Sequence, residues 1–296
     1  PAFDPTLALA LAAAAALAVL AVLAIVVRRR LVRRPRPAPP TSRPSARDLL
    51  RRFDALARAA AERTRRGERP LRPWWLVIGP AGHGKSSLLA AAPRCVEIAP
   101  GPPGEPRFFL APYGVFLELP EGAPPAALLR ALRRQDPPAA GVLVVLRADA
   151  LADDAALALV RTQLDHLAAA LALQVPVVLT VAQLDRLSGF AELTADLSSR
   201  TSVLGATLPP RSGPDSLQVA ARERLTGEGG PLAWVRQRCH ALVARARTDD
   251  ERTARLHGFW QLFERLLAQA AAAAARLAAG PDDPARVRAI YFTSAR

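Results

Sequence analysis

Short runs of consecutive apolar residues recur along the chain from about residue 72, and helical patterns separate them. The runs at 141–146 and 176–181 are rich in valine and carry no charge, which is typical of strands buried on both faces of a parallel sheet. Apolar residues recur at the spacing of one helical face over 157–171. Shorter runs that fit strands are 74–78, 95–98, 107–110 and 114–119. Strands that alternate with helices predict an α/β fold with a largely parallel sheet.

The pattern becomes helical from about residue 216. A broad apolar stripe runs from Leu256 to Leu267, and the helix that carries it is predicted to end at Gly280-Pro281. A last strand-like stretch follows at 287–294. We therefore expect an α/β domain over 73–209, then a helical extension with a final strand over 210–296.

The N-terminal part has a different character. Residues 7–27 carry no charge and would extend roughly 31 Å as a helix, enough to cross a bilayer. The arginines that follow at once predict a single-pass span in 1–27, with the bulk of the chain in the cytoplasm. A helix packed within a protein stays open as the alternative. Residues 28–72 are expected to form a basic linker, Pro-rich over 35–44, that ends in an amphipathic helix.

Charge is concentrated in the same N-terminal part. The chain has a formal net charge of +14, and residues 1–72 hold most of it, with 16 arginines against five acidic residues. A nucleic-acid-binding domain should carry its basic patch on the folded part. We therefore expect no nucleic acid among the partners of this chain.

The clearest chemical motif joins the apolar run 74–78 to a helix-compatible segment. It reads G-x-x-x-x-G-K-S over Gly79–Ser86, and strand, glycine-rich loop and helix are the context of a phosphate-binding P-loop. The predicted nucleotide-binding residues are Gly79, Pro80, Ala81, Gly82, His83, Gly84, Lys85, Ser86 and Ser87. A glycine-rich turn that binds nothing stays open as the alternative.

Two residues of the motif have specific roles in such a loop. Lys85 would reach the β- and γ-phosphates, and the hydroxyl of Ser86 would ligate Mg²⁺. Lys85 is also the only lysine of the chain, since every other basic residue is arginine. A compact ammonium on a flexible stem is thus kept at the one position where a guanidinium could not replace it.

Three segments together resemble the TssM/IcmF family, the inner-membrane NTPase-like subunit of bacterial type VI secretion systems. The first is Pro-Trp-Trp-Leu-Val-Ile-Gly-Pro over 73–80, which enters the P-loop. The second extends from 175–190 to Val-Leu-Gly-Ala-Thr-Leu-Pro over 203–209. The third is Val-Arg-Ala-Ile-Tyr-Phe-Thr-Ser over 287–294. Their order and spacing agree with the family over roughly 70–296.

The resemblance implies a Ras-like P-loop NTPase domain with a helical extension, tethered to the inner membrane and facing the cytoplasm. It also implies ATP or GTP with Mg²⁺ as ligand. The implied partners are an IcmH/DotU-like subunit and other components of the envelope complex, and a homo-oligomer is possible. The family's membrane hairpin of two helices differs from the one span visible here.

Two family motifs are altered in this chain. The aspartate-threonine-alanine-glycine segment falls at 118–122, where Glu118 could hold Mg²⁺ through water although the spacing to Gly122 is one residue longer. The base-reading segment falls at 182–185, where Asp185 could accept hydrogen bonds from guanine and Gln183 cannot supply a lysine stem.

We therefore expect a membrane-anchored scaffold subunit of a type VI secretion complex. It would bind a nucleoside triphosphate with weak or absent hydrolysis, because phosphoryl transfer also needs an oriented water. Two alternatives stay open. One is a membrane-tethered GTPase switch of the receptor-subunit type, and the other is a structural module with a relic P-loop.

Overall fold

The computed structural model describes ten stretches of the chain: 46–65, 74–98, 104–134, 139–171, 176–195, 197, 204–209, 214–245, 250–278 and 287–294. The predicted membrane span of residues 7–27 and the Pro-rich linker lie outside them. Within the described stretches, no helix is both long and apolar enough to cross a membrane. The chain divides into the units Pro1–Pro44 and Ser45–Arg296, and the description that follows concerns the second.

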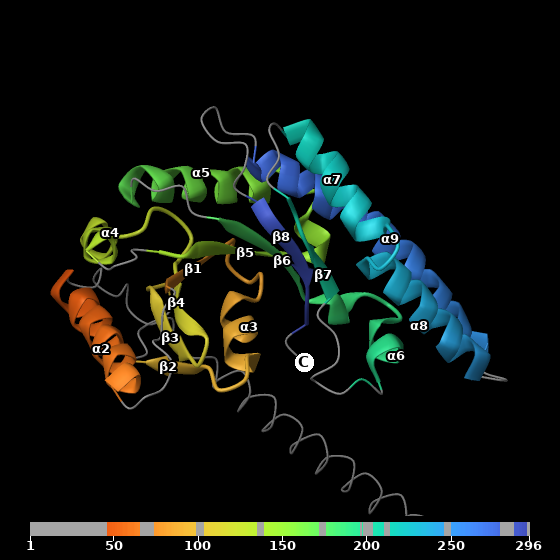
Figure 1. Ribbon diagram of the computed structural model, residues 1–296, viewed down its shortest axis with the longest axis horizontal. Helices are drawn as coiled ribbons and strands as arrows, with labels where there is room; N and C mark the ends of the chain where they lie inside the picture. The colour runs from red at the N-terminus through yellow and green to blue at the C-terminus, as the bar shows by residue number, and fades with distance from the viewer. Residues whose placement is uncertain are drawn as a thin grey trace, which may run out of the picture. The chain divides into compact units, whose positions relative to one another are not determined.

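The described strands form one eight-stranded sheet in the order β2-β3-β4-β1-β5-β6-β8-β7 (Figure 1). Its central strands are parallel: β4 (Gly114–Glu118), β1 (Trp74–Ile78), β5 (Gly141–Arg147), β6 (Val177–Ala182) and β8 (Val287–Phe292). The antiparallel edge strands are β2 (Val96–Ile98), β3 (Arg107–Ala111) and β7 (Leu204–Thr207). The largely parallel α/β sheet expected from the apolar runs is confirmed.

The two faces of the sheet are covered unequally. Side chains alternate between the faces of a strand, so Leu76 and Ile78 join the larger core and Val77 joins the smaller one. The larger core includes buried residues of α2 (Ala46–Arg65), α4 (Ala126–Arg133), α5 (Asp154–Leu171) and α9 (Asp250–Ala278). The smaller core includes Leu89 of α3 (Lys85–Ala91), which lies on the opposite face from α5 (Figure 1).

The C-terminal helices pack around α9. These are α6 (Phe190–Thr194), α7 (Pro214–Thr226) and α8 (Pro231–Arg245). The ring of Phe263 on α9 meets that of Phe292 on β8 with their centroids 5.2 Å apart, so the helical part is joined to the sheet through the final strand. The C-terminal helices are therefore confirmed, while the domain boundary at residue 209 stays a prediction.

The order of the strands places a crevice at one end of the sheet. From β1 the chain builds β2, β3 and β4 on one side, and α4 then carries it across to β5 on the other side. In open α/β sheets, ligands bind outside the carboxyl ends of the strands at such a switch point. The loop that follows β1 is therefore in the position of a ligand-binding loop.

Candidate functional site

The loop between β1 and α3 depends on three glycines with positive φ angles. The angles are +139° at Gly79, +76° at Gly82 and +91° at Gly84, a region that residues with a side chain rarely adopt. A Cβ atom at Gly79 would also lie 2.2 Å from the carbonyl oxygen of Val145 on β5. The loop thus turns tightly against the sheet.

The side chain of Lys85 is folded back onto this loop. Its Nζ donates hydrogen bonds to the carbonyl oxygens of Gly79 at 2.7 Å and Pro80 at 2.9 Å, and the residue is only 7% exposed. Burial lowers the pKa of the ammonium group, and the nearby carboxylates of Glu118 and Glu121 oppose that shift. The one lysine of the chain is therefore held inside the loop, with its charge satisfied by two carbonyl oxygens of the loop itself.

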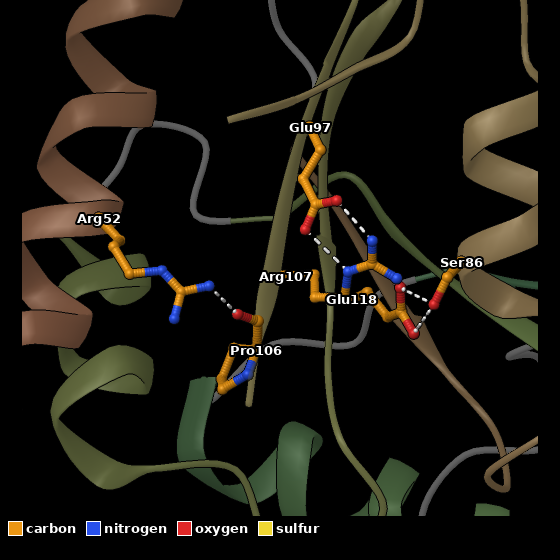
Figure 2. Close-up of polar contacts among 6 residues, drawn as sticks. All are labelled: Arg52, Ser86, Glu97, Pro106, Arg107 and Glu118. Carbon is orange, nitrogen blue, oxygen red and sulfur yellow. Dashed lines mark hydrogen bonds and ion pairs between the residues drawn. The ribbon is translucent and has the colours of Figure 1, made fainter. Parts of the chain in front are cut away.

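Ser86 and Glu118 meet at the carboxyl end of β4. The Ser86 hydroxyl lies 2.8 Å from each carboxylate oxygen of Glu118 and can donate to either (Figure 2). Glu118 is 8% exposed and lies beside Val77 in the parallel pairing of β1 with β4. The pairing of the two strands therefore brings this carboxylate to the first turn of α3.

This pair suits a magnesium ion chemically. A hydroxyl and a carboxylate are the oxygen ligands that Mg²⁺ prefers, and Mg²⁺ usually keeps several waters besides one or two protein ligands and substrate phosphates. Ser86 and Glu118, the two residues predicted for this role, are adjacent and half-buried or buried. Among the described residues, no group of three or more His, Cys, Asp or Glu side chains forms a metal site.

A cation stands next to Glu118 on β3. Arg107 is its cross-strand neighbour, and it forms an ion pair with Glu97 of β2 through two hydrogen bonds, one of them 2.8 Å long (Figure 2). The hydrogen bond from Arg107 is the main cause of the lowered pKa of Glu97. Sequence reasoning missed Arg107, because its position beside Glu118 depends on the antiparallel register of β3.

His83 is buried within the loop. Its Nδ1 accepts a hydrogen bond from the backbone N–H of Arg147 at 3.3 Å, which joins the loop to the end of β5. Burial lowers the pKa of the imidazole, and the charges of Arg147 and Lys85 lower it further. The neutral form that can accept this hydrogen bond is therefore favoured.

A pocket of about 280 Å³ opens beside the loop. It is lined by Gly84, Ser87, Leu88, Ala182, Gln183, Asp185, Arg186 and Thr293. The predicted base-reading residue Asp185 is thus brought together with the predicted loop residues. Its carboxylate accepts a hydrogen bond of 2.5 Å from the hydroxyl of Ser294, which follows β8.

Gln183 connects this pocket to the loop. Its Nε2 donates to the carbonyl oxygen of Gly82 at 3.0 Å, and its side chain lies within 3.1 Å of where a Cβ of Gly84 would stand. The backbone at Gln183 is left-handed, with φ +61°. The amide of Gln183 therefore links the loop to the residues of the pocket, at the position where the family pattern has a lysine.

Comparison with known proteins gives a family and several structural likenesses. Residues 126–296 match the family model of the IcmF-related N-terminal domain. No curated protein sequence matches the chain.

Among solved structures, the chain is similar to the small COPII coat GTPase SAR1 from Encephalitozoon cuniculi in complex with GDP. The two are 17% identical, the match covers 49% of this chain and 68% of that one, and the TM-score is 0.30. It is also similar to a chain of the SRb-GTP/SRX complex of the signal recognition particle receptor from Chaetomium thermophilum. Here the identity is 20%, the match covers 38% of this chain and 70% of that one, and the TM-score is 0.25. A mutant NFeoB of S. thermophilus bound to GDP is 12% identical, over 66% of this chain and 99% of that one, with a TM-score of 0.27.

Proposed function

We propose that this chain, which belongs to the family of IcmF-related N-terminal domains, is a membrane-anchored, nucleotide-binding scaffold subunit of a type VI secretion complex. Its ligand would be ATP or GTP with Mg²⁺, bound through residues 79–87, with weak or absent hydrolysis. Its domain would have the Ras-like form of a P-loop protein. The bulk of the chain would face the bacterial cytoplasm from a single span in the inner membrane.

One observation carries the nucleotide proposal. The buried ammonium of Lys85 and the Ser86–Glu118 pair occupy consecutive positions at the start of α3, beside the crevice that the strand order creates. A buried lysine costs free energy unless it gains partners, and here its partners are two loop carbonyls that a phosphate can replace. The residues thus form a site for an anion and its accompanying cation.

In this proposal each group has a separate task. The backbone N–H groups of the glycine-rich loop bind phosphate oxygens, and Lys85 turns from the carbonyls of Gly79 and Pro80 toward the β- and γ-phosphates. Mg²⁺, held by Ser86 and by Glu118 directly or through water, would neutralise charge on the phosphates. Asp185, oriented by Ser294, is placed to accept hydrogen bonds from a guanine base.

Weak hydrolysis is part of the proposal because, in the part of the chain that the structure describes, no side chain is assigned to orient an attacking water. Phosphoryl transfer needs an oriented water in addition to the loop and the metal. Glu121, the second carboxylate of the altered segment 118–122, accepts a hydrogen bond of 3.2 Å from the backbone N–H of Ala81. It is therefore not positioned as a free base in this conformation.

The partners follow from the family. An IcmH/DotU-like inner-membrane subunit, further envelope components and a second copy of the chain are the candidates. Co-purification of the chain with an IcmH/DotU-like subunit is the measurement that checks this. A chain that assembles normally after Lys85→Ala would show that nucleotide does not control assembly.

A membrane-tethered GTPase switch is the second candidate. The contact between Ser294 and Asp185 favours it, because that contact fixes a carboxylate inside the pocket next to the loop. Selectivity for GTP over ATP, with measurable turnover, would support a switch rather than a scaffold.

Equilibrium dialysis of the purified full chain with labelled GTP or ATP and Mg²⁺ tests the proposed function. We expect binding that Lys85→Ala weakens roughly a hundredfold, since the variant loses a charge-assisted contact inside the site. Arg130→Ala, which removes one positive charge at an exposed position of α4, is the matched control. Absence of binding in the unaltered chain would favour the relic P-loop, and turnover abolished by Lys85→Ala would refute the weak-hydrolysis proposal.

A further inference from the structure

The loop that follows β4 places a carboxylate on the P-loop. This loop contains Pro120, Glu121 and Gly122, and Oε2 of Glu121 accepts a hydrogen bond of 3.2 Å from the backbone N–H of Ala81. Backbone N–H groups of a P-loop are the donors that bind phosphate oxygens. An acidic side chain of the protein itself therefore takes one of the positions that a phosphate oxygen would take.

Gln163 of α5 holds the backbone on both sides of Glu121. The Gln163 side chain is 3% exposed, and its Nε2 donates to the carbonyl oxygens of Pro120 at 3.1 Å and Gly122 at 3.3 Å. Those two carbonyls flank Glu121 on both sides. The backbone that carries the carboxylate is thus fixed to a buried side chain of a long helix.

The position of Glu121 corresponds to the far end of a bound phosphate chain. The pocket that would take the base is lined by Gly84 and Ser87, so the phosphates would extend from there past Lys85. Lys85 reaches the β- and γ-phosphates in such loops, and the Glu121 charge acts on Lys85. Ala81 belongs to the opposite half of the loop from Ser87. In this binding mode, a carboxylate held at Ala81 would contact the terminal phosphate of a triphosphate. It would not reach the two phosphates of a diphosphate.

We propose that Glu121 is a specificity determinant of the nucleotide site, which disfavours the terminal phosphate of a triphosphate by occupying the Ala81 N–H. The proposal rests on the nucleotide-binding function proposed above. Two like charges cannot share one donor without loss of binding energy. Binding of a triphosphate therefore requires the Glu121 carboxylate to leave, whereas a diphosphate leaves it in place.

The test compares ligands that have two phosphates with ligands that have three, bound to the full-length protein in the presence of Mg²⁺. Affinities for GDP, GTP, inorganic pyrophosphate and tripolyphosphate are measured by calorimetric titration. Glu121→Gln keeps the size of the side chain and removes its charge, and because the residue is exposed the variant should fold normally. We expect the triphosphate and tripolyphosphate affinities to rise about tenfold, and the diphosphate and pyrophosphate affinities to change by less than about twofold.

Two further variants make the result specific. Glu228→Gln removes the same charge from an exposed position outside the P-loop and is expected to change none of the four affinities. Gln163→Ala frees the backbone on both sides of Glu121 and is expected to shift the triphosphate affinity in the same direction as Glu121→Gln, by a smaller factor.

The pattern of affinity changes shows whether Glu121 acts on the terminal phosphate. A rise limited to the longer phosphate chains supports the specificity role. An equal rise for both lengths shows a general charge effect and overturns that role, as does no change, and both results leave the nucleotide site standing. Absence of binding in the unaltered chain, Glu121→Gln and Lys85→Ala alike overturns the proposed function together with this inference.

Discussion

The hydroxyl of Ser86 and the carboxylate of Glu118 are 2.8 Å apart although 32 positions separate them in the chain. Ser86 belongs to the first turn of α3, and Glu118 is the last residue of β4, whose parallel pairing with β1 brings it there. The two oxygens converge at the carboxyl ends of adjacent strands, where the strand order opens its crevice. This relationship leads to a prediction about magnesium.

If Ser86 and Glu118 hold Mg²⁺, nucleotide affinity should depend on Mg²⁺ in the unaltered chain and lose that dependence in Ser86→Ala or Glu118→Gln. We expect a loss of about tenfold in the presence of Mg²⁺ and little change in EDTA, because the variants remove oxygen ligands and leave the loop in place. Thr162→Ala, which removes a hydroxyl from an exposed position of α5, is the control and should leave the affinity unchanged in both conditions. Dialysis with and without EDTA measures the effect. Equal losses in both conditions would show that the pair does not act through a metal.

Two glycines of the loop should differ in their cost to stability when replaced by alanine. At Gly79 the new Cβ would lie 2.2 Å from a backbone oxygen, on a φ of +139°. We therefore expect Gly79→Ala to destabilise the fold by about 3 kcal/mol. At Gly82 nothing lies within 4 Å of the Cβ, so only the left-handed backbone costs free energy, about 1 kcal/mol. Urea unfolding of both variants checks the order, and a larger loss for Gly82→Ala would contradict it.

The buried imidazole of His83 should make the free energy of unfolding depend on pH. Burial lowers the pKa of its imidazole below the ordinary value of 6.5, so below pH 6.5 the unfolded chain binds a proton that the folded chain does not. The stabilisation is complete above pH 6.5 and is lost as the pH falls toward the lowered pKa. Between pH 7 and pH 5, His83→Gln should therefore lose less free energy of unfolding than the unaltered chain. His166→Gln, at an exposed position of α5, serves as control, and parallel curves for all three proteins would refute the prediction.

The contact of Ser294 with Asp185 leads us to expect that Asp185 determines selectivity for guanine over adenine. Asp185→Asn replaces one acceptor oxygen of the carboxylate by a donor, which cannot receive hydrogen bonds from guanine N1 and N2. We expect GTP affinity to fall about tenfold or more and ATP affinity to be unchanged. Ser294→Ala should give a smaller loss in the same direction, because it removes one hydrogen bond that orients the carboxylate and leaves the carboxylate itself in place. Competition binding with both nucleotides measures this, and Asp165→Asn, at an exposed position of α5, is the control. Equal losses for GTP and ATP would show that Asp185 does not read the base.

Local patterns in the sequence were enough to predict the loop and the strands that carry it. The strand at Trp74–Ile78, the glycines of the loop and Lys85 lie next to one another in the chain, so their chemistry can be read without knowledge of the fold. The buried runs that became β5 and β6 are equally local. For these elements, hydrophobic burial over a few residues determines the structure.

The contacts that complete the site depend on strand register and could not be read in this way. Ser294 reaches Asp185 only because β8 pairs with β6, with Phe292 opposite Val181. Arg107 stands beside Glu118 for a similar reason, through β3 and β4. The role of Glu121 depends on the path of the loop after β4, which brings its carboxylate to the backbone N–H of Ala81. The one signal in the sequence is that the altered segment 118–122 holds a second carboxylate besides Glu118.

The place of β8 between β6 and β7 has a consequence for the order of folding on the ribosome. Residues 183–286 separate β6 from β8 in the chain, and such distant pairings form late because the ends of a long loop must first meet. Strands β1 to β6 and the loop after β1 are synthesised first. Until residues 287–294 follow, Asp185 lacks its contact with Ser294 and the edge of β6 that pairs with β8 stays open. A nascent chain stalled before β8 would thus present the proposed phosphate-binding loop without the completed pocket around Asp185. It would also present an unpaired edge of β6, on which another chain can dock.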